Sequence, residues 1–455
     1  MSSAIQYTNL KRIYFIGIGG IGMSALARYF HFNNVVVTGY DRTETALTKQ
    51  LQQEGIAIHF TDDIALADLN ADLIIYTPAI PKEHKEYNYF LANGYPIRKR
   101  AQVLGELSAS KFTIAIAGSH GKTTVSSMIA WILKHSGYDC TAFLGGISAN
   151  FNSNFVAGKN DVMVIEADEF DRSFLQLHPD IAVITAVDSD HLEIYGTQQE
   201  LEKTFTEFAH QVTEKGKVVL KSSLPILKNI KREKYSYSIN DTNADLFVAD
   251  YKITLSGSQV RLNNGMQYEL IYPGIHNIEN SVAASSVALL LGIEKNNIIS
   301  ALNVFNGVHR RFEIMYQNDA IVFIDDYAHH PEEIAMFLKS VRAIYTGKKI
   351  TAIFQPHLFT RTRDLAEGFS ESLSIADEVL LLPIYPAREL PIEGVSSAMI
   401  YNNILSPSKH LMEKENLLEY IQTQPLEIVC TIGAGDIDKL VEPIARTLKQ
   451  KNPQL

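Results

Sequence analysis

Cysteine is nearly absent from this chain, with only Cys140 and Cys430 among 455 residues. Two thiols so far apart cannot form a disulfide framework, which excludes a disulfide-stapled secreted domain and fits a reducing compartment. We expect both to be small, buried apolar residues. No apolar run approaches the ~20 residues that a membrane span needs. The first residues, MSSAIQYTNLKR, lack the basic-then-apolar pattern of a secretory signal. We therefore expect a cytoplasmic protein with no membrane partner.

Positive charge is also in the minority, because the chain has 41 Lys and Arg but 51 Asp and Glu, which gives a formal net charge of -10. Without a long Lys/Arg run, a nucleic acid or an anionic membrane surface is not expected as the main partner. The sequence contains no internal repeat and no low-complexity segment. At roughly 100 to 200 residues per domain, two to four domains are expected, in a monomer or a homodimer.

Short apolar runs alternate with helix-length amphipathic segments along the whole chain, which predicts an α/β fold built on parallel sheets. The first series has strands at 12–18, 35–41 and 72–77, with a helix at 21–32. The second series opens with KFTIAIAG and the third with AIVFIDD, and a β-rich patch at about 235–272 precedes a helix near 280–291. We predict three domains: a Rossmann-like domain (1–107), a P-loop ATPase-like domain with an added β-rich region (108–312), and a second Rossmann-like domain (313–455).

The stretch GIGGIGMS follows the first predicted strand and opens a helix, so it meets the G-x-G-x-x-G pattern in its proper context. Glycines let backbone N–H groups approach a diphosphate, and a helix N-terminus favours its negative charge. An NAD(P) cofactor or a UDP-sugar would satisfy the same physics, and a tight turn is the alternative. The candidate substrate-binding residues here are Gly17, Gly19, Gly20, Gly22, Met23, Ser24 and Asp41.

A second glycine loop, GSHGKTT, lies between another predicted strand and a helix from Thr123 to His135. The common phosphate loop has its first glycine where Ile116 stands here, so this loop is shorter. Lys122 would reach the terminal phosphates, and the Thr123 hydroxyl would ligate Mg²⁺. An ordinary N-capped turn is the alternative.

The shortened loop resembles that of the ATP-dependent Mur ligase and folylpolyglutamate synthase superfamily. A histidine at position 120 is typical of the members that act directly on UDP-N-acetylmuramate. Further segments agree along the chain: EADEFDRSFL, DSDHLEIYG, HNIEN, NGVHRRFE, DDYAHHP, QPHLFTRTRDL, YPARE and GAGDI. The resemblance implies that ATP phosphorylates the muramoyl carboxylate. The amine of L-alanine then attacks the acyl phosphate, in peptidoglycan precursor synthesis with ATP and Mg²⁺.

The resemblance also implies roles for individual residues. Catalytic roles fall on Lys122, His191 and His357, and the metal ligands would be Thr123, Glu166 and His191. The nucleotide would contact Gly118, Ser119, His120, Gly121, Lys122, Thr123, Thr124, His276, Asn277, Asn280, Arg310, Arg311 and Asp326. We expect His276, Asn277 and Asn280 to precede the helix near 280–291, and Asp168, Glu169 and Asp171 to form a solvated acidic turn.

For the amino acid, the resemblance implies that Arg361 binds the alanine carboxylate with help from Tyr327 or Arg388. The chain departs from the family at two positions. Leu358 stands where the family often has arginine, and Ala186 where it usually has asparagine.

Three other activities compete with this interpretation. The nearest is a recycling ligase that joins a tripeptide to UDP-N-acetylmuramate, although its N-terminal loop normally departs from GIGGIGMSALA. An NAD(P)-dependent oxidoreductase would leave GSHGKTT and the third domain without a role. A P-loop ATPase module would not explain the first glycine loop.

Overall fold

The computed structural model describes residues 7–188, 192–255, 257–387 and 389–451. The chain divides into two compact units. The first unit holds residues 1–251, 259–270 and 276–306, and the second holds 252–258, 271–275 and 307–455. Among the residues described, no helix is both long and apolar enough to cross a membrane. Both cysteines are buried and unpaired, as predicted.

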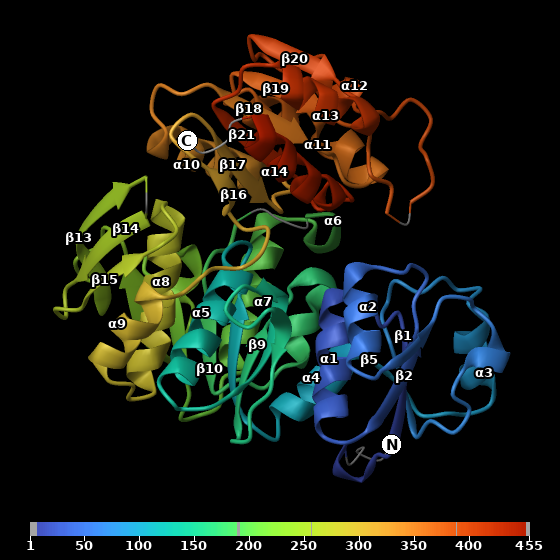
Figure 1. Cartoon of the computed structure of the whole chain (residues 1–455). Coiled ribbons are helices and arrows are strands. Elements are labelled where there is room, and N and C mark those ends of the chain that lie inside the picture. The colour runs from blue at the N-terminus through green and yellow to red at the C-terminus, as the bar shows by residue number, and fades with distance from the viewer. Residues whose placement is uncertain (1–6, 189–191, 256, 388, 452–455) are drawn as a thin grey trace. The chain divides into compact units, whose positions relative to one another are not determined.

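The first unit begins with a parallel sheet (Figure 1). It has five strands, in the order β3-β2-β1-β4-β5. Its strands are β1 (Arg12–Ile16), β2 (Val36–Tyr40), β3 (Ala57–His59), β4 (Leu73–Tyr76) and β5 (Ile97–Lys99). Its helices are α1 (Ile21–Phe32), α2 (Ala46–Gln53), α3 (Lys85–Ala92) and α4 (Arg100–Ser108). Helix α1 has the predicted bounds. The predicted first strand is two residues too long, because Gly17 turns the chain with a φ of +88°.

The first unit also carries most of a ten-stranded sheet in the order β15-β14-β13-β12-β11-β10-β6-β9-β7-β8. Its strands are β6 (Phe112–Ala117), β7 (Thr141–Ser148), β8 (Ser153–Val156), β9 (Val162–Glu166), β10 (Ile181–Ile184), β11 (Lys217–Lys221), β12 (Glu233–Ser238), β13 (Leu246–Thr254), β14 (Gly257–Leu262) and β15 (Gln267–Leu270). The β-rich patch predicted from the sequence is thus the outer part of this sheet.

The helices between these strands are α5 (Lys122–His135), α6 (Leu192–Tyr195) and α7 (Gln198–His210), and α8 (Ile275–Leu290) and α9 (Lys295–Asn303) follow the last strand. The prediction that helix α8 starts near residue 280 was wrong, because the helix begins directly after Pro273 and Gly274. His276, Asn277 and Asn280 therefore lie inside its first turns rather than before it. Ile278 packs in the core from the same segment, which extends the apolar face of the helix toward its start.

The second unit is built on a six-stranded sheet in the order β16-β17-β21-β18-β19-β20, in which only β16 runs antiparallel to its neighbour. The strands are β16 (Glu313–Gln317), β17 (Val322–Asp326), β18 (Ile350–Phe354), β19 (Glu378–Leu381), β20 (Ser408–Leu411) and β21 (Ile428–Ile432). The helices are α10 (Pro331–Ile344), α11 (Phe359–Leu373), α12 (Ala398–Tyr401), α13 (Lys414–Thr423) and α14 (Asp438–Lys451).

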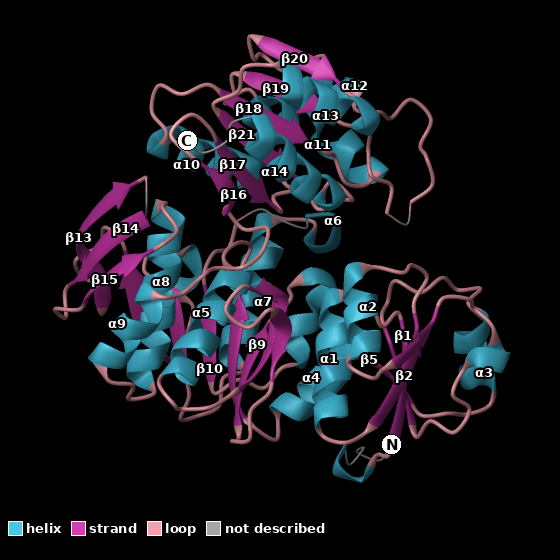
Figure 2. Ribbon diagram, viewed as in Figure 1, coloured by secondary structure: helices cyan, strands magenta, loops and turns pink. Residues whose placement is uncertain are grey.

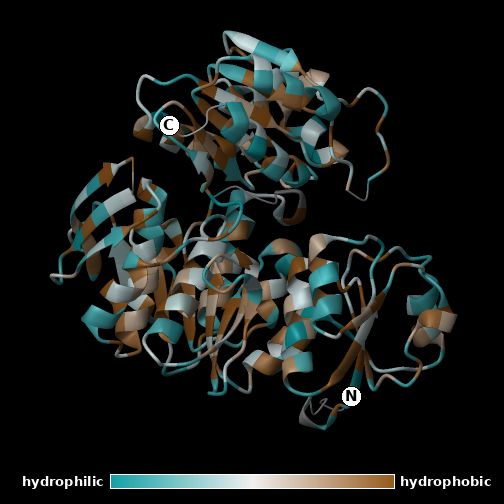
Figure 3. Cartoon of the chain, viewed as in Figure 1, coloured by the Kyte–Doolittle hydropathy of each residue, from teal (hydrophilic) through white to brown (hydrophobic). Residues whose placement is uncertain are grey.

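Helices lie against the sheets in both units (Figure 2), and the central strands are largely hydrophobic (Figure 3). Strands β17, β18 and β21 are buried along their whole length. This pattern is typical of parallel sheets that are covered on both faces, and the fold class is α/β as predicted. Since parallel strands end at one edge of a sheet, the loops after β6, β9 and β10 meet there.

Candidate active site

The loop from β6 to α5 needs glycine at two positions. Gly118 has a φ of +145° and Gly121 a φ of +82°, values that residues with a side chain rarely adopt. A Cβ atom on Gly118 would also lie 2.1 Å from the Thr185 hydroxyl oxygen. The loop therefore brings its backbone close to the β10 edge and ends at Lys122, the first residue of α5.

Lys122 lies inside the site rather than in solvent. Its Nζ donates to the Gly118 carbonyl oxygen at 2.6 Å and to Glu169 Oε1 at 2.7 Å. Burial opposes the charged form of Lys122, but the adjacent Glu169 carboxylate holds its pKa above the ordinary value. The lysine is thus a mostly buried cation, with 16% of its side chain exposed, beside the loop that is predicted to bind phosphate.

The expectation that Glu169 belongs to a solvated acidic turn was wrong, because its side chain is only 2% exposed. Asp171 and Arg172 adopt left-handed φ angles of 53° and 54°, so the chain turns sharply just after Glu169. The Tyr195 hydroxyl donates to the Glu169 carbonyl oxygen at 2.5 Å and fixes that turn. Asp171 stays exposed, and Asp168 is half-buried.

Glu166 lies at the end of β9, as predicted, and meets the start of α5. Its Oε1 accepts a hydrogen bond from the Thr123 hydroxyl at 3.0 Å, and its Oε2 accepts one from the Gly145 N–H at 2.9 Å. A carboxylate and a hydroxyl are oxygen ligands of the kind Mg²⁺ prefers. The pair therefore fits a magnesium ion shared by Thr123 and Glu166. The third predicted ligand, His191, lies outside the described residues.

Ser119 and His120 hold the loop that follows β10. The Asp188 N–H donates to the Ser119 hydroxyl at 2.7 Å, and His120 Nε2 lies 3.6 Å from an Asp188 carboxylate oxygen. The Ser119 N–H donates to the Ala186 carbonyl oxygen at 3.1 Å. Because this contact uses only the backbone of Ala186, the loop is supported without the asparagine that is usual in the family. Thr124 lies half-buried in the first turn of α5.

The start of α8 brings one predicted residue to the phosphate loop. A Cβ atom placed on Gly121 would lie 2.7 Å from the Asn280 side-chain oxygen, so Asn280 is directly beside the loop. Asn277 is buried, and burial lowers the pKa of His276 to about 4. His276 is thus a neutral imidazole near pH 7, which suits a hydrogen-bonding role better than an electrostatic one.

In the second unit, the predicted nucleotide residues form a compact group. The Arg310 guanidinium donates to Asp325 at 3.0 Å, and those of Arg310 and Arg311 both lie 5.2 Å from the centre of the Tyr327 ring. Asp326 accepts hydrogen bonds from the Phe312 and Ala328 N–H groups, and burial raises its pKa to about 6. Asp325, which was not among the predicted site residues, is buried and is the partner of Arg310.

The residues predicted to recognise alanine follow β18. His357 stacks on Tyr385, with ring centres 5.8 Å apart, and burial lowers its pKa to about 4. Leu358 has a φ of +72°, and its N–H donates to the Tyr385 carbonyl oxygen. Arg361, in the first turn of α11, makes no ion pair among the described residues, whereas Arg363 pairs with the adjacent Asp364. Arg388 lies outside the described residues.

The N-terminal glycine loop is held by contacts of its own. The Gly19 N–H donates to Asp41 Oδ2 at 2.8 Å, so the Asp41 carboxylate fixes the loop. A Cβ atom on Gly19 would lie 2.7 Å from the Thr48 side chain, whereas one on Gly20 would have no neighbour nearer than 3.6 Å. Met23 is buried. Ser24 is fully buried, and its hydroxyl donates to the Ile21 carbonyl oxygen.

Arg100 is a residue near this loop that the sequence analysis missed. Its guanidinium would lie 2.4 Å from a Cβ atom on Gly22, and it also lies 3.6 Å from Asp168. Arg100 is 78 residues beyond Gly22 in the sequence, so no local pattern indicates this proximity.

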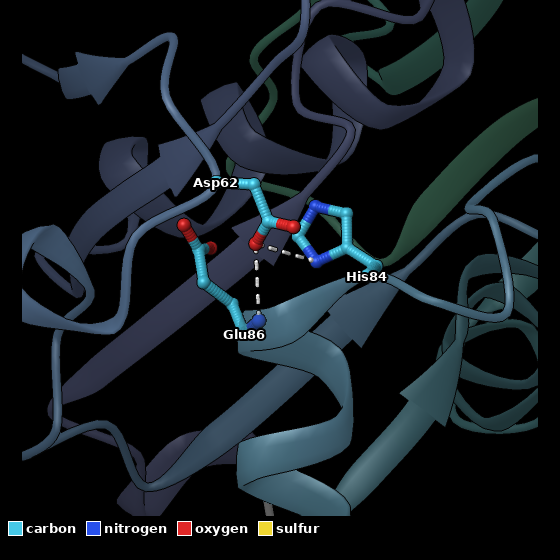
Figure 4. A group of neighbouring side chains, drawn as sticks. All are labelled: Asp62, His84 and Glu86. Atoms are coloured by element: carbon cyan, nitrogen blue, oxygen red, sulfur yellow. Dashed lines mark hydrogen bonds and ion pairs between the residues drawn. The ribbon is translucent and has the colours of Figure 1, made fainter.

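A cluster of Asp62, His84 and Glu86 lies elsewhere, beside the start of α3 (Figure 4), with ligand-type atoms within 4.8 Å of one another. Its carboxylates already have hydrogen-bond donors. The first two backbone N–H groups of α3 donate to Asp62, and the Tyr14 hydroxyl and the Asp63 N–H donate to Glu86. We therefore interpret the cluster as a buried cap of α3 rather than a metal centre.

Glu86 gives the protein a testable pH dependence. The side chain is fully buried, and burial raises its pKa from 4.5 to about 7. The folded state therefore keeps a proton that the unfolded state loses above pH 4.5. This contribution to stability is complete below pH 4.5 and is lost as the pH rises through 7. Between pH 5 and pH 8, wild type should lose up to about 3 kcal/mol of unfolding free energy relative to Glu86→Gln.

Denaturant titrations of both proteins at the two pH values measure this difference. His59, whose pKa burial lowers, contributes in the opposite direction, with stability lost as the pH falls. His59 is present in both proteins, but its Nε2 lies 3.6 Å from Glu86 Oε1, so its contribution cancels only in part, and a His59→Asn background removes it. An equal pH dependence in wild type and Glu86→Gln would contradict the assignment.

Comparison with known proteins agrees with this geometry over nearly the whole chain. Residues 12–112 match the Mur ligase family catalytic domain, residues 116–288 the Mur ligase middle domain, and residues 310–435 the Mur ligase glutamate ligase domain. The chain belongs to the Mur ligase family. The three family domains follow one another along the chain in the order catalytic, middle and glutamate ligase domain.

Several members of the Mur ligase family are similar along their full length. The UDP-N-acetylmuramate--L-alanine ligase of Flavobacterium johnsoniae is 46% identical over 457 residues, which is 98% of this chain and 100% of the relative. The ligase of the same name from Porphyromonas gingivalis W83 is 45% identical, over 97% of this chain and 99% of its own. The crystal structure of UDP-N-acetylmuramate-alanine ligase from Thermotoga maritima is 28% identical and superposes with a TM-score of 0.82, over 98% and 100% of the two chains.

Proposed function

We propose that this Mur ligase joins L-alanine to the carboxylate of UDP-N-acetylmuramate, with ATP and Mg²⁺, in peptidoglycan precursor synthesis in the cytoplasm. The observation that carries the proposal is the Lys122 cation at the loop from β6 to α5, ion-paired with buried Glu169, beside the Thr123–Glu166 oxygen pair. The relatives named above, similar over their full length, support the choice of substrates. We further propose residues 1–107 as the UDP-sugar domain, 108–312 as the ATP domain and 313–455 as the amino-acid domain.

In the first step, the muramoyl carboxylate oxygen attacks the γ-phosphorus of ATP, and ADP leaves. Lys122 stabilises the negative charge that develops on the transferring phosphoryl group. Thr123 and Glu166 would hold Mg²⁺, which neutralises phosphate charge when it is bound. In the second step, the alanine amine attacks the acyl carbon, and the bond between that carbon and the oxygen that bridges to phosphorus breaks. Phosphate leaves with this oxygen and takes up the proton that the amine loses. Neutral His357 accepts a hydrogen bond from that amine, and Arg361 binds the alanine carboxylate.

Phosphate release from ATP tests the proposed reaction directly. With UDP-N-acetylmuramate present, L-alanine should accelerate release, whereas the cell-wall tripeptide should not. The amide product should carry one alanine by mass spectrometry. Faster release with the tripeptide would instead assign the chain to peptide recycling. Oxidation of NAD(P)H with these substrates would favour an oxidoreductase.

Gly20→Ala tests the role of the N-terminal glycine loop. Gly20 has a φ of -67° and a ψ of 144°, which any residue adopts, and a Cβ atom there meets only ordinary contacts. The methyl group should keep a diphosphate away from the backbone and raise the Kd for UDP-N-acetylmuramate about tenfold, a change of roughly 1.4 kcal/mol. The Kd for ATP should not change.

Isothermal calorimetry with each ligand measures the two affinities. Gly19→Ala is the contrasting variant, since its Cβ atom would collide with Thr48 and Asp41 and should lower the melting temperature. Wild-type affinity of Gly20→Ala for UDP-N-acetylmuramate would show that the diphosphate binds elsewhere.

A further inference from the structure

Asn154 is a fully buried amide on β8 that faces the first turn of α1. Its Nδ2 donates to the Ile21 carbonyl oxygen at 2.5 Å and to the Ser24 hydroxyl at 2.9 Å. Its Oδ1 accepts a hydrogen bond from Arg28. Because a guanidinium can only donate, this contact fixes which end of the amide is oxygen. Both N–H groups and the oxygen of Asn154 are therefore engaged.

These contacts act on the segment that carries the N-terminal glycine loop. Ile21 is the first residue of α1 and directly follows Gly20. The Ser24 hydroxyl also donates to the Ile21 carbonyl oxygen, at 2.9 Å. Two side chains thus hold one carbonyl group at the point where the loop becomes a helix. A shift of this turn would move the N–H groups that precede it.

The strand that carries Asn154 is also connected to Glu166, the carboxylate that is proposed to bind Mg²⁺. Strand β8 pairs with β7, and β7 pairs with β9, which ends at Glu166. The Gly145 N–H on β7 donates to Glu166 Oε2. Helix α1 packs on the same hairpin through Tyr29, whose ring centre lies 5.5 Å from that of Phe143 on β7. One hairpin therefore supports both the glycine loop and Glu166.

We propose that Asn154 is a positioning residue for UDP-N-acetylmuramate, which sets the glycine loop in register with the site of phosphoryl transfer. This inference rests on the proposed role of the glycine loop in binding the UDP diphosphate. Apolar side chains would be enough to hold a helix on a hairpin. A saturated polar network instead defines one arrangement of the two, because every displaced donor or acceptor would be left buried and unpaired.

Asn154→Asp separates positioning from packing. The aspartate keeps the size of the side chain and an acceptor for Arg28, but it loses both donors and faces the Ile21 carbonyl oxygen with negative charge. We expect its Kd for UDP-N-acetylmuramate to rise about tenfold or more, since two hydrogen bonds are lost. The Kd for ADP with Mg²⁺ should stay within about twofold. Asn154→Leu, whose side chain cannot form hydrogen bonds, should likewise weaken binding of UDP-N-acetylmuramate and leave the Kd for ADP with Mg²⁺ nearly unchanged.

Glu54→Gln is the matched control. Glu54 is the other partner of Arg28, at 2.7 Å, and among the described residues no hydrogen bond or ion pair joins it to the first turn of α1. This variant should lower the melting temperature and leave both dissociation constants unchanged. Calorimetry and thermal melts on the full-length protein supply all the readouts.

The outcomes distinguish the two proposals. If folded Asn154→Asp and Asn154→Leu bind UDP-N-acetylmuramate like wild type while Gly20→Ala does not, the positioning role is overturned and the loop assignment stands. An equal loss of affinity for both ligands would overturn it too, because Asn154 would then be merely structural. If Gly20→Ala also binds normally, the loop assignment itself fails.

Discussion

Replacing Lys122 with methionine is expected to lower the rate of amide formation by about 10³-fold or more, an effect typical of removing a positive charge from a transferring phosphoryl group. Methionine keeps most of the length of the side chain but carries no charge. The variant also leaves Glu169 buried without its cation. Breaking a buried ion pair is strongly destabilising, so we expect a loss of roughly 3 kcal/mol in unfolding free energy.

The double variant Lys122→Met/Glu169→Gln separates these two effects. It removes the unpaired carboxylate, so its melting temperature should return toward wild type while phosphate release stays at the level of the single variant. Recovery of activity together with stability would mean that Lys122 serves the fold and does not act on the phosphoryl group.

Arg361→Ala is expected to raise the KM for L-alanine by about 10²-fold, because a charge-assisted pair in a desolvated site is worth a few kcal/mol. Acyl phosphate formation precedes attack by the amine and should persist. Trapping with hydroxylamine in the absence of alanine measures it. Arg361→Lys should recover only part of the affinity, since an ammonium group keeps the charge but loses the planar fork.

Arg363→Ala is the matched control, two positions along the same helix. Arg363 is exposed and pairs with Asp364, so its loss should leave the KM for alanine unchanged. If Arg361→Ala binds alanine normally, or loses acyl phosphate trapping as well, the carboxylate is held by another group.

The sequence predicted those features that depend on local pattern. Helix α1 has the predicted bounds, because its apolar residues recur at helical spacing directly after a glycine turn. Glu166 was expected at a strand end for a similar reason. The predicted start of α8 was wrong because His276 and Asn277 are polar, whereas Pro273 and Gly274 just before the helix are the stronger start signal.

Features that depend on distant contacts could not be predicted. Glu169 lies among acidic residues that indicate a surface turn, yet its burial is decided by Lys122, 47 residues away. Asn154 meets α1 across more than 120 residues of sequence. Such contacts follow from how sheets and helices pack, and no periodicity encodes them.

Leu358 adopts a φ of +72°, which costs a residue with a side chain on the order of 1–3 kcal/mol. Its N–H is fixed by the Tyr385 carbonyl oxygen, and its own carbonyl oxygen accepts hydrogen bonds from Thr362. The backbone beside His357 is therefore fixed by hydrogen bonds within the protein itself. Because alanine has few atoms, its binding free energy is small, and the entropic cost of ordering a loop would offset much of it. If alanine binds here as proposed, a rigid, strained backbone lets so small a ligand bind without that entropic penalty.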